Sequence, residues 1–245
     1  MKNYQDRATN NLNTFCNNQT LKEKRQLLLY ISKRFAEEGI EWCLTCSSTL
    51  FFRGIKESFN DFDILIDYRY ITKAIQIMKE LKAIDLPKGD QSMFASTLFN
   101  RYQIGNVKID LFSEWRISAH FTFTYAYSGE DVDVITIEEN KIQIVSAETQ
   151  MVLYSVLTPW QPYREEKVVM LKDYLNEVGR KHPKSFDNQL PADIIAKYKW
   201  LWEIRGHLPS YSRFFRLYIQ STILCKNYKK LFDKIHNLID NINMK

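Results

Sequence analysis

The spacing of hydrophobic residues predicts alternating helices and strands in the first part of the chain. Apolar side chains recur every three or four positions over residues 20–39, where Thr20 and Glu23 form a candidate capping box. Short apolar runs at 40–44 and 62–68 are typical of buried strands. The full prediction up to residue 146 is helix 20–39, strand 40–44, a short helix from 50 that ends at Gly54, strand 62–68, helix 72–83, and strands 94–104, 107–112, 134–137 and 142–145.

Beyond residue 146 the apolar spacing becomes helical almost throughout, and prolines separate the segments. The predicted helices are 147–157, 164–178, 191–206 and 210–240. We therefore predict an α+β fold in which a small mixed β-sheet is flanked by helices and followed by a helical region. The predicted boundary divides the chain into an α/β domain with N-terminal helices, residues 1–146, and a C-terminal helical domain, residues 147–245.

Composition narrows the class of protein. The chain has 245 residues, of which 45% are hydrophobic and 14% aromatic, as expected for a folded globular protein. Its apolar runs fall short of the roughly 20 residues that a membrane helix needs, so we expect no membrane partner. The polar N-terminus resembles no signal peptide, and the expected location is the cytoplasm.

The net charge of +5 comes from the second half of the chain. From Ala147 onward there are 16 Lys and Arg residues against 10 Asp and Glu residues. A basic second half could bind a polyanion, which would be nucleotide phosphates, RNA or an acidic partner. The basic residues are spread along helical segments, which favours a solvated surface over a nucleic-acid partner. Cys43 and Cys46 form a C-x-x-C pair, for which reduced core cysteines are the favoured interpretation because the histidines are scattered.

The strongest candidate chemistry is the acidic pair Asp61 and Asp63 at the start of an apolar strand. Residues two apart on a strand point to the same face, so the two carboxylates project together. Adjacent carboxylates repel each other, and a hard divalent cation removes that repulsion. The alternative is that Asp61 belongs to a turn and that Asp63 is an exposed strand end.

Small residues precede this pair in the run from Thr45 to Thr49. A turn of small residues before a helix exposes backbone N–H groups that suit phosphate, and Ser47 and Ser48 add hydroxyl donors. An ordinary helix cap explains either serine equally well. Arg53 and Lys56 lie between this turn and the acidic pair and are candidates to reach a triphosphate, although exposed helix-end positions explain them equally well.

A third acid, Asp110, follows in the otherwise apolar run from Val107 to Phe112. A buried lone aspartate is costly without a charge partner, and a metal on a neighbouring strand would supply one. Asp110 could also accept a proton from an attacking hydroxyl. The alternatives are that Asp110 pairs with an arginine or is exposed at a sheet edge.

The order of these features resembles the nucleotidyltransferase superfamily, whose fold is shared by polymerase-beta-like enzymes and by aminoglycoside and lincosamide nucleotidyltransferases. The resemblance covers roughly residues 40–115 and implies that Ser47, or the residue beside it, binds phosphate. It also implies that Asp61 and Asp63 ligate two magnesium ions and that Asp110 holds the catalytic one. The implied reaction moves a nucleoside monophosphate from a nucleoside triphosphate to a hydroxyl of a small molecule, RNA or protein and releases pyrophosphate. ATP is the expected triphosphate. Cys46 stands where the family has glycine.

Two other functions stay open at this stage. The substitution at Cys46 leaves room for a nucleotidyltransferase-like binding protein without activity, for example a partner in a defence or toxin–antitoxin pair. A D-x-D glycosyltransferase also uses an acidic pair, but it leaves Asp110 and the small-residue turn unexplained. A second D-x-D, Asp131 and Asp133, is interpreted as a solvated strand start. The active enzyme is the favoured hypothesis, because all three acids of the pattern are present.

Overall fold

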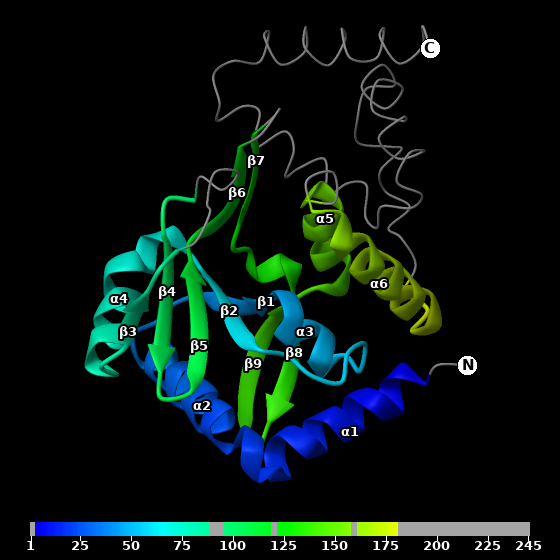
Figure 1. Cartoon of the computed structure of the whole chain (residues 1–245), viewed down its shortest axis with the longest axis horizontal. Coiled ribbons are helices and arrows are strands. Elements are labelled where there is room, and N and C mark those ends of the chain that lie inside the picture. Colours follow the sequence, from blue (N-terminus) through cyan, green and yellow to red (C-terminus); the bar gives the residue numbers. More distant parts are fainter. Residues whose placement is uncertain (1–2, 89–95, 119–121, 158–160, 181–245) are drawn as a thin grey trace, which may run out of the picture.

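A computed structural model describes residues 3–88, 96–118, 122–157 and 161–180 (Figure 1). The predicted helices 191–206 and 210–240 lie outside these residues, and the domain boundary at 146 stays a prediction. Over the described ranges, no helix has both the length and the apolar character to cross a membrane.

The described chain forms helices around one large sheet and one two-stranded arm. The α-helices are α1 (Tyr4–Asn17), α2 (Lys22–Glu37), α3 (Cys46–Phe52), α4 (Ile71–Glu80), α5 (Ala147–Leu157) and α6 (Glu165–Glu177). Short 3-10 helices are η1 (Gln19–Leu21), η2 (Tyr68–Tyr70), η3 (Gly129–Asp131) and η4 (Pro162–Arg164). The strands are β1 (Trp42–Thr45), β2 (Asp61–Ile66), β3 (Ile84–Leu86), β4 (Phe99–Ile104), β5 (Val107–Phe112), β6 (Glu114–Ser118), β7 (Thr122–Ala126), β8 (Val132–Ile137) and β9 (Asn140–Val145).

The large sheet is mixed, with the strand order β3-β4-β5-β2-β1-β9-β8. β2 lies at its centre, antiparallel to β1 and parallel to β5. β6 and β7 form a separate antiparallel pair that projects beyond the sheet (Figure 1). This architecture confirms the predicted α+β class with a small mixed sheet and flanking helices.

Alternation along β2 separates the hydrophobic core from the acidic residues. Phe62, Ile64 and Ile66 are fully buried in the main core. That core includes Leu28, Ile31 and Phe35 of α2 and Ala74, Ile77 and Met78 of α4. Because side chains alternate along a strand, Asp61 and Asp63 point to the opposite face. The helices α2 and α4 therefore anchor the strand and leave its acidic face to the site.

Helix α1, which the hydrophobic pattern did not predict, closes the other flank of the core. Its Phe15 ring lies edge-on to Phe52 of α3, with ring centroids 5.2 Å apart. Asn11 donates its amide hydrogens to the carbonyls of Phe51 and Lys56, at 2.7 and 2.8 Å. The Phe51 carbonyl also accepts from the Gly54 N–H at 2.9 Å, so Asn11 adds a second bond there and ties α1 to the Lys56 carbonyl beyond α3. Helix α1 thereby fixes the end of α3.

Several local predictions need correction. Thr20 is not a helix N-cap: Asn18 caps η1 by accepting from the Thr20 N–H at 2.8 Å, and α2 begins at Lys22. Of the predicted strand 94–104, residues 94 and 95 lie outside the described ranges, and β4 begins at Phe99. The sequence pattern also missed β3 and the β6–β7 arm, because their alternation is too short or too mixed to stand out.

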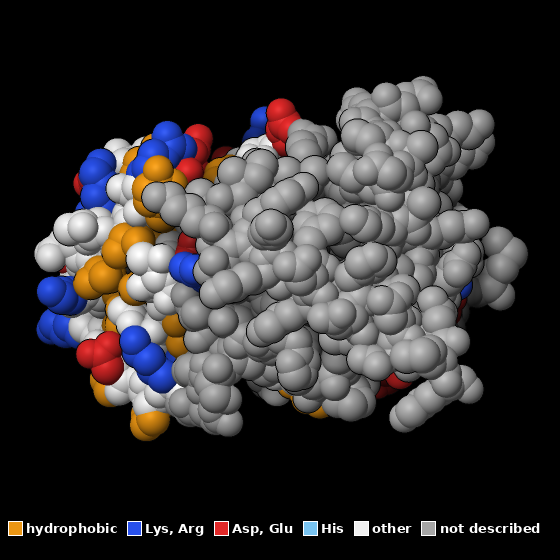
Figure 2. Space-filling view, turned by 90° about the horizontal axis from the view of Figure 1, so that it is seen from above, with side chains coloured by type: hydrophobic (Ala, Val, Ile, Leu, Met, Phe, Trp, Pro, Cys, Tyr) orange, Lys and Arg blue, Asp and Glu red, His pale blue; other side chains and the backbone are white. Residues whose placement is uncertain are grey.

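Figure 2 shows one face of the molecule, on which Lys and Arg side chains of the described part are interspersed with hydrophobic and uncharged ones.

Gly54 provides a test of the contact between α1 and the loop after α3. Both Gly54 and Gly39 have positive φ, +69° and +64°. A Cβ on Gly54 would lie 2.5 Å from the Ala8 nitrogen and 2.6 Å from the Tyr4 carbonyl oxygen, whereas one on Gly39 meets nothing within 4 Å. We expect Gly39→Ala to lower the free energy of unfolding by about 1–2 kcal/mol through backbone strain alone. Gly54→Ala should cost roughly 1–3 kcal/mol more, because α1 must move.

Urea denaturation of the two variants provides the measurement. Equal losses in both variants would show that α1 does not pack tightly against the loop after α3.

Candidate active site

Four polar residues form a row across the sheet at one level. In the strand register Thr45 of β1 faces Asp63 of β2, Asp63 faces Asp110 of β5, and Asp110 faces Arg101 of β4. Directly paired residues share a face of the sheet, so all four side chains project from the side opposite α2. The row places two carboxylates on neighbouring parallel strands.

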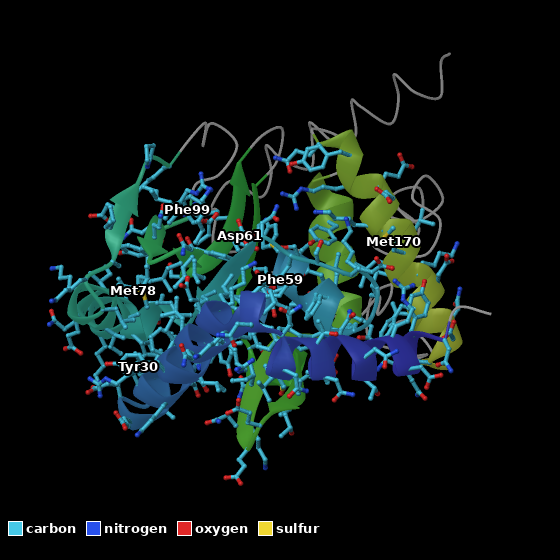
Figure 3. All side chains as sticks on the ribbon, turned by 60° about the horizontal axis from the view of Figure 1, so that its bottom comes forward. Tyr30, Phe59, Asp61, Met78, Phe99 and Met170 are labelled. Atoms are coloured by element: carbon cyan, nitrogen blue, oxygen red, sulfur yellow. The ribbon has the colours of Figure 1, made fainter. Side chains whose placement is uncertain are left out.

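Asp61 joins this row from the start of β2, two residues before Asp63 and on the same face. In Figure 3, Asp61 lies above Phe59, with α1 and α2 below both. Lys24 of α2 donates to the Phe59 carbonyl at 2.7 Å. Burial lowers the pKa of Lys24, and the charge of Asp61 partly offsets that effect. Asp61 therefore has a cation on its core side.

The three carboxylates destabilise one another's charged forms. Burial raises the pKa of Asp63 well above its ordinary value, and the charges of Asp61 and Asp110 raise it further. Burial also raises the pKa of Asp110, although its hydrogen bond from Arg101 acts in the opposite direction. A half-buried carboxylate facing two others is a cost to folding that apolar packing does not explain. The arrangement needs a positive partner.

The donor set suits a hard divalent cation, because all three groups are carboxylates on one face of adjacent strands. As the side chains stand, however, no group of three or more His, Cys, Asp or Glu residues in the described ranges converges to hold a metal. The Arg101 Nε lies 3.0 Å from the Asp110 Oδ1, so this third carboxylate already has a charge partner. The oxygen donors of Asp61, Asp63 and Asp110 are nevertheless of the kind that a hard divalent cation takes.

Cys46 begins α3 next to this row, and its backbone is left-handed, with φ +58°. Residues with a Cβ rarely adopt this conformation, and glycine adopts it freely. Its N–H donates to Oε1 of Gln150, a fully buried residue of α5, at 2.7 Å. Burial and then the charge of Asp63 raise the pKa of the Cys46 thiol, so the thiol stays protonated. The position demands glycine-like geometry, and Gln150 holds the strained residue in place.

A basic cluster from α6 and its preceding turn lies near Cys46, where the charges of Arg164 and Lys167 oppose the rise in the thiol pKa. The Arg164 guanidinium lies 5.3 Å from the centroid of the buried Tyr154 ring, and the Lys167 ammonium lies 5.1 Å from it. The charge of Arg164 opposes the raised pKa of Asp63, which shows that cluster and carboxylate share one electrostatic neighbourhood. Burial and then the charge of Arg164 lower the pKa of Lys167, and Lys56 adds to that shift. Lys56, Arg164 and Lys167 thus flank the acidic row.

The structure separates the predicted phosphate-binding residues. Ser47 is half-buried beside Cys46, and Lys56 lies in the basic cluster. Ser48 is fully buried, and its hydroxyl donates to the Thr45 carbonyl at 3.1 Å. The Ser48 hydroxyl therefore serves the first turn of α3, and the prediction of an exposed donor at this position needs correction.

Arg53 also has a different place from the one predicted. It is 4% exposed, and its Nη2 bonds Oδ2 of Asp133 at 2.7 Å and the Val145 carbonyl. Asp133 is bonded in turn by Arg180, which also pairs with Glu148 of α5 at 3.1 Å. Asp133 is therefore no solvated strand start, and Asp131 is also buried, at 7% exposure. Arg53 is committed to a network that fixes α5 and the end of α6 against β8.

Sequence reasoning gave no role to Arg101, Gln150 or Tyr154, and it assigned none to Arg164 or Lys167. Each acts through a contact between segments far apart in the chain, such as the 104 residues between Cys46 and Gln150. None of these five residues carries a local motif.

No protein-family model matches the sequence, and no curated protein matches it. Similar solved structures include a proposed nucleotidyltransferase of Thermotoga maritima, with 20% identity, a TM-score of 0.47, and coverage of 64% of this chain and 94% of that one. The lincomycin-bound lincosamide adenylyltransferase LnuA has 16% identity and a TM-score of 0.42, covering 62% and 97%. ANT(2")-Ia in complex with adenylyl-2"-tobramycin has 10% identity and a TM-score of 0.48, covering 76% and 99%. At these values the chemistry of this chain must be argued from its own residues.

The repulsion among the carboxylates predicts that Asp63→Asn stabilises the metal-free protein. A carboxyl whose pKa is raised by folding binds its proton more tightly in the folded state. Its contribution to stability therefore falls as the pH rises from the unfolded-state pKa through the folded-state pKa. We expect Asp63→Asn to raise the free energy of unfolding at pH 7, in EDTA, by about 1 kcal/mol.

Asp67→Asn is the matched control, because a hydrogen bond from Arg69 lowers the pKa of Asp67. That substitution should lower the free energy of unfolding by about 0.5–1 kcal/mol. Urea melts of both variants provide the comparison, and a loss of stability in Asp63→Asn would contradict a strained acidic row.

The left-handed backbone predicts opposite behaviour at the two cysteines of the C-x-x-C pair. Cys46→Gly relieves strain of roughly 1–2 kcal/mol and should leave the free energy of unfolding unchanged or raised. Cys43 is fully buried in the extended strand β1, so Cys43→Gly should lose about 1–3 kcal/mol. Thermal and urea melts measure both, and equal losses would remove the evidence for strain at Cys46.

Proposed function

We propose that this protein is a nucleotidyltransferase. It moves a nucleoside monophosphate from a nucleoside triphosphate to a hydroxyl group and releases pyrophosphate. ATP is the triphosphate proposed as the donor. The observation that carries the proposal is the acidic row: Asp63 and Asp110 face each other on parallel strands, and Asp61 projects from the same face. Their order along the chain and their place beside the α3 turn agree with the pattern in the sequence. Folding gains nothing from three like charges held so close.

The residues that would hold metal are Asp61, Asp63 and Asp110, and two magnesium ions is the number proposed. Bound magnesium would neutralise charge that develops on the phosphates during transfer. Without it, the repulsion between carboxylates and triphosphate would oppose binding. The protein's own contribution is to hold the three carboxylates on a rigid central strand pair.

The triphosphate has a matching set of cations in this site. Arg164, Lys167 and Lys56 flank Cys46 and Asp63, and the aromatic face of Tyr154 orients the first two. Phosphate oxygens accept hydrogen bonds from guanidinium and ammonium groups, and these bonds are strengthened by charge. Ser47 adds a hydroxyl beside them. We assign these four residues to the nucleotide side of the site.

Asp110 is the residue proposed to accept the proton of the acceptor hydroxyl. Burial raises its pKa, which moves the carboxylate toward the range in which a general base works at neutral pH. The acceptor is a small molecule, an RNA or a protein. RNA is the less favoured class, because the basic residues of the second half are spread along the sequence and not clustered.

A second candidate is a nucleotide-binding or partner-binding protein without catalysis. Two contacts favour it. The backbone N–H of Cys46 already donates to Gln150, and Asp110 already forms an ion pair with Arg101. In this form the site would retain its fold while the turn and the third acid are blocked.

Magnesium-dependent binding of a nucleotide tests whether the acidic row forms a nucleotide site. We expect a magnesium-dependent thermal shift with at least one of the four triphosphates, and its loss in the double variant Asp61→Ala with Asp63→Ala. Asp85→Ala, which removes an exposed carboxylate on β3, is the control and should behave like the wild type.

Pyrophosphate release with aminoglycosides, lincosamides and tRNA as acceptors then separates the enzyme from the binding protein. The double variant should lose activity by roughly 10³-fold or more. A nucleotide-dependent shift without pyrophosphate release would support the non-catalytic candidate. If the wild type shows no magnesium-dependent shift with any of the four triphosphates, the enzyme candidate fails and the partner-binding candidate takes its place.

A further inference from the structure

Asp110 of β5 forms an ion pair with Arg101 of the neighbouring strand β4. Arg101 pairs with Asp110 in the antiparallel register of β4 and β5, and its Nε donates to the Asp110 Oδ1 at 3.0 Å. The Asp110 side chain is 13% exposed, so this bond forms largely out of water. Charge-assisted hydrogen bonds of this kind are among the stronger ones in proteins. The pair is therefore a defined contact and not a passing surface encounter.

The bond occupies one of the two carboxylate oxygens of Asp110, the group proposed to ligate metal. A guanidinium and a divalent cation both carry positive charge, so they cannot share one carboxylate at full strength. In the described part of the chain the side chains form no three-ligand cluster as they stand, and Asp110 is engaged by Arg101. The acidic row has two alternative partners: an arginine already in the fold, or an added cation.

Arg101 has room to leave. Its side chain is 30% exposed, more than twice the exposed fraction of Asp110. Its Nη1 lies 3.5 Å from the Pro87 carbonyl oxygen, at the margin of a hydrogen bond. A long side chain on this margin can turn toward Pro87 and solvent while the strand stays in place. The asymmetry in exposure makes Arg101 the mobile partner and Asp110 the fixed one.

We propose that Arg101 is a displaceable counter-ion of Asp110: a divalent cation must replace it, and Arg101 thereby sets the metal concentration at which the site fills. This inference rests on the proposed function, since it takes Asp61, Asp63 and Asp110 as the metal ligands. Arg101 is a positioning residue in this scheme. It stabilises the acidic row in the empty protein and raises the concentration of metal required for occupancy.

Metal binding itself is the test, measured by calorimetric titration of the full chain with MgCl₂ and with MnCl₂, without nucleotide. Arg101→Gln should bind either ion about tenfold more tightly than the wild type, because a charge-assisted hydrogen bond no longer competes. Arg101→Lys keeps a charge that can still compete and should lie between them. Melting curves in EDTA show whether each variant is folded, and Arg101→Gln should melt lower than the wild type there because Asp110 loses its partner.

Lys108→Gln is the matched control. It removes the same charge from the neighbouring strand, and Lys108 pairs with Asp61 in the β2–β5 register. Its effect on metal affinity should stay within about twofold, as expected for screened charge without a direct bond. A double-mutant cycle adds specificity: in an Asp110→Asn background, Arg101→Gln should give no further tightening.

The outcomes are distinct. Tighter binding in Arg101→Gln, small change in Lys108→Gln and loss of the effect with Asp110→Asn support the proposal. Metal binding by Arg101→Gln alone, with none by the wild type over the same concentrations, also supports the counter-ion role of Arg101. Equal affinity in wild type and Arg101→Gln, or equal tightening in Lys108→Gln, overturns the counter-ion role while leaving the metal site standing. If neither protein binds either ion, the metal site fails, and both the proposed function and this inference fall with it.

Discussion

Repulsion between carboxylates at the centre of the sheet is the constraint on which the rest of this structure depends. Asp63 faces Asp110 across parallel strands, and Asp61 projects from the same face. Like charges directly opposite each other in a sheet are destabilising, and burial increases the effect. The fold tolerates them because the opposite face of β2 is anchored by Phe62, Ile64 and Ile66 in a continuous apolar core. The core supplies the stability that the acidic face loses.

The surrounding elements are arranged to bring positive charge to that face. Arg53, Asp133 and Arg180 link the end of α3, strand β8 and the end of α6 through two contacts of 2.7 Å. Because a helix is stiff, holding one end of α6 also orients its other end, where Lys167 lies beside the Tyr154 ring. The network of Arg53, Asp133 and Arg180 thus has a structural role. By holding one end of α6, it helps to place Lys167, at the other end, near Asp63.

The sequence predicted features that depend on local pattern and missed those that depend on long-range contacts. Alternation along residues 61–66 was sufficient to place both aspartates on one face, and the apolar run around Asp110 was sufficient to identify a neighbouring strand. Helix α1 was missed because its apolar residues are few, and it is fixed by contacts such as those of Asn11 with the α3 loop. Arg53 was misplaced because its partner, Asp133, lies 80 residues away. Ser48 was misplaced because burial cannot be read from a run of small polar residues.

Cys46 connects these observations to chemistry. A left-handed backbone with a Cβ costs about 1–2 kcal/mol, so an ordinary structural position would have relaxed to an extended or helical conformation. The turn keeps this geometry instead, and Gln150 stabilises it through the Cys46 N–H. A strained residue beside a repulsive acidic row means that two independent costs meet at one place. Local costs that meet at one place are the signature of a site whose shape serves binding or catalysis more than stability. The proposed nucleotidyltransferase chemistry supplies a reason for both costs, because the same turn and the same carboxylates would face the triphosphate.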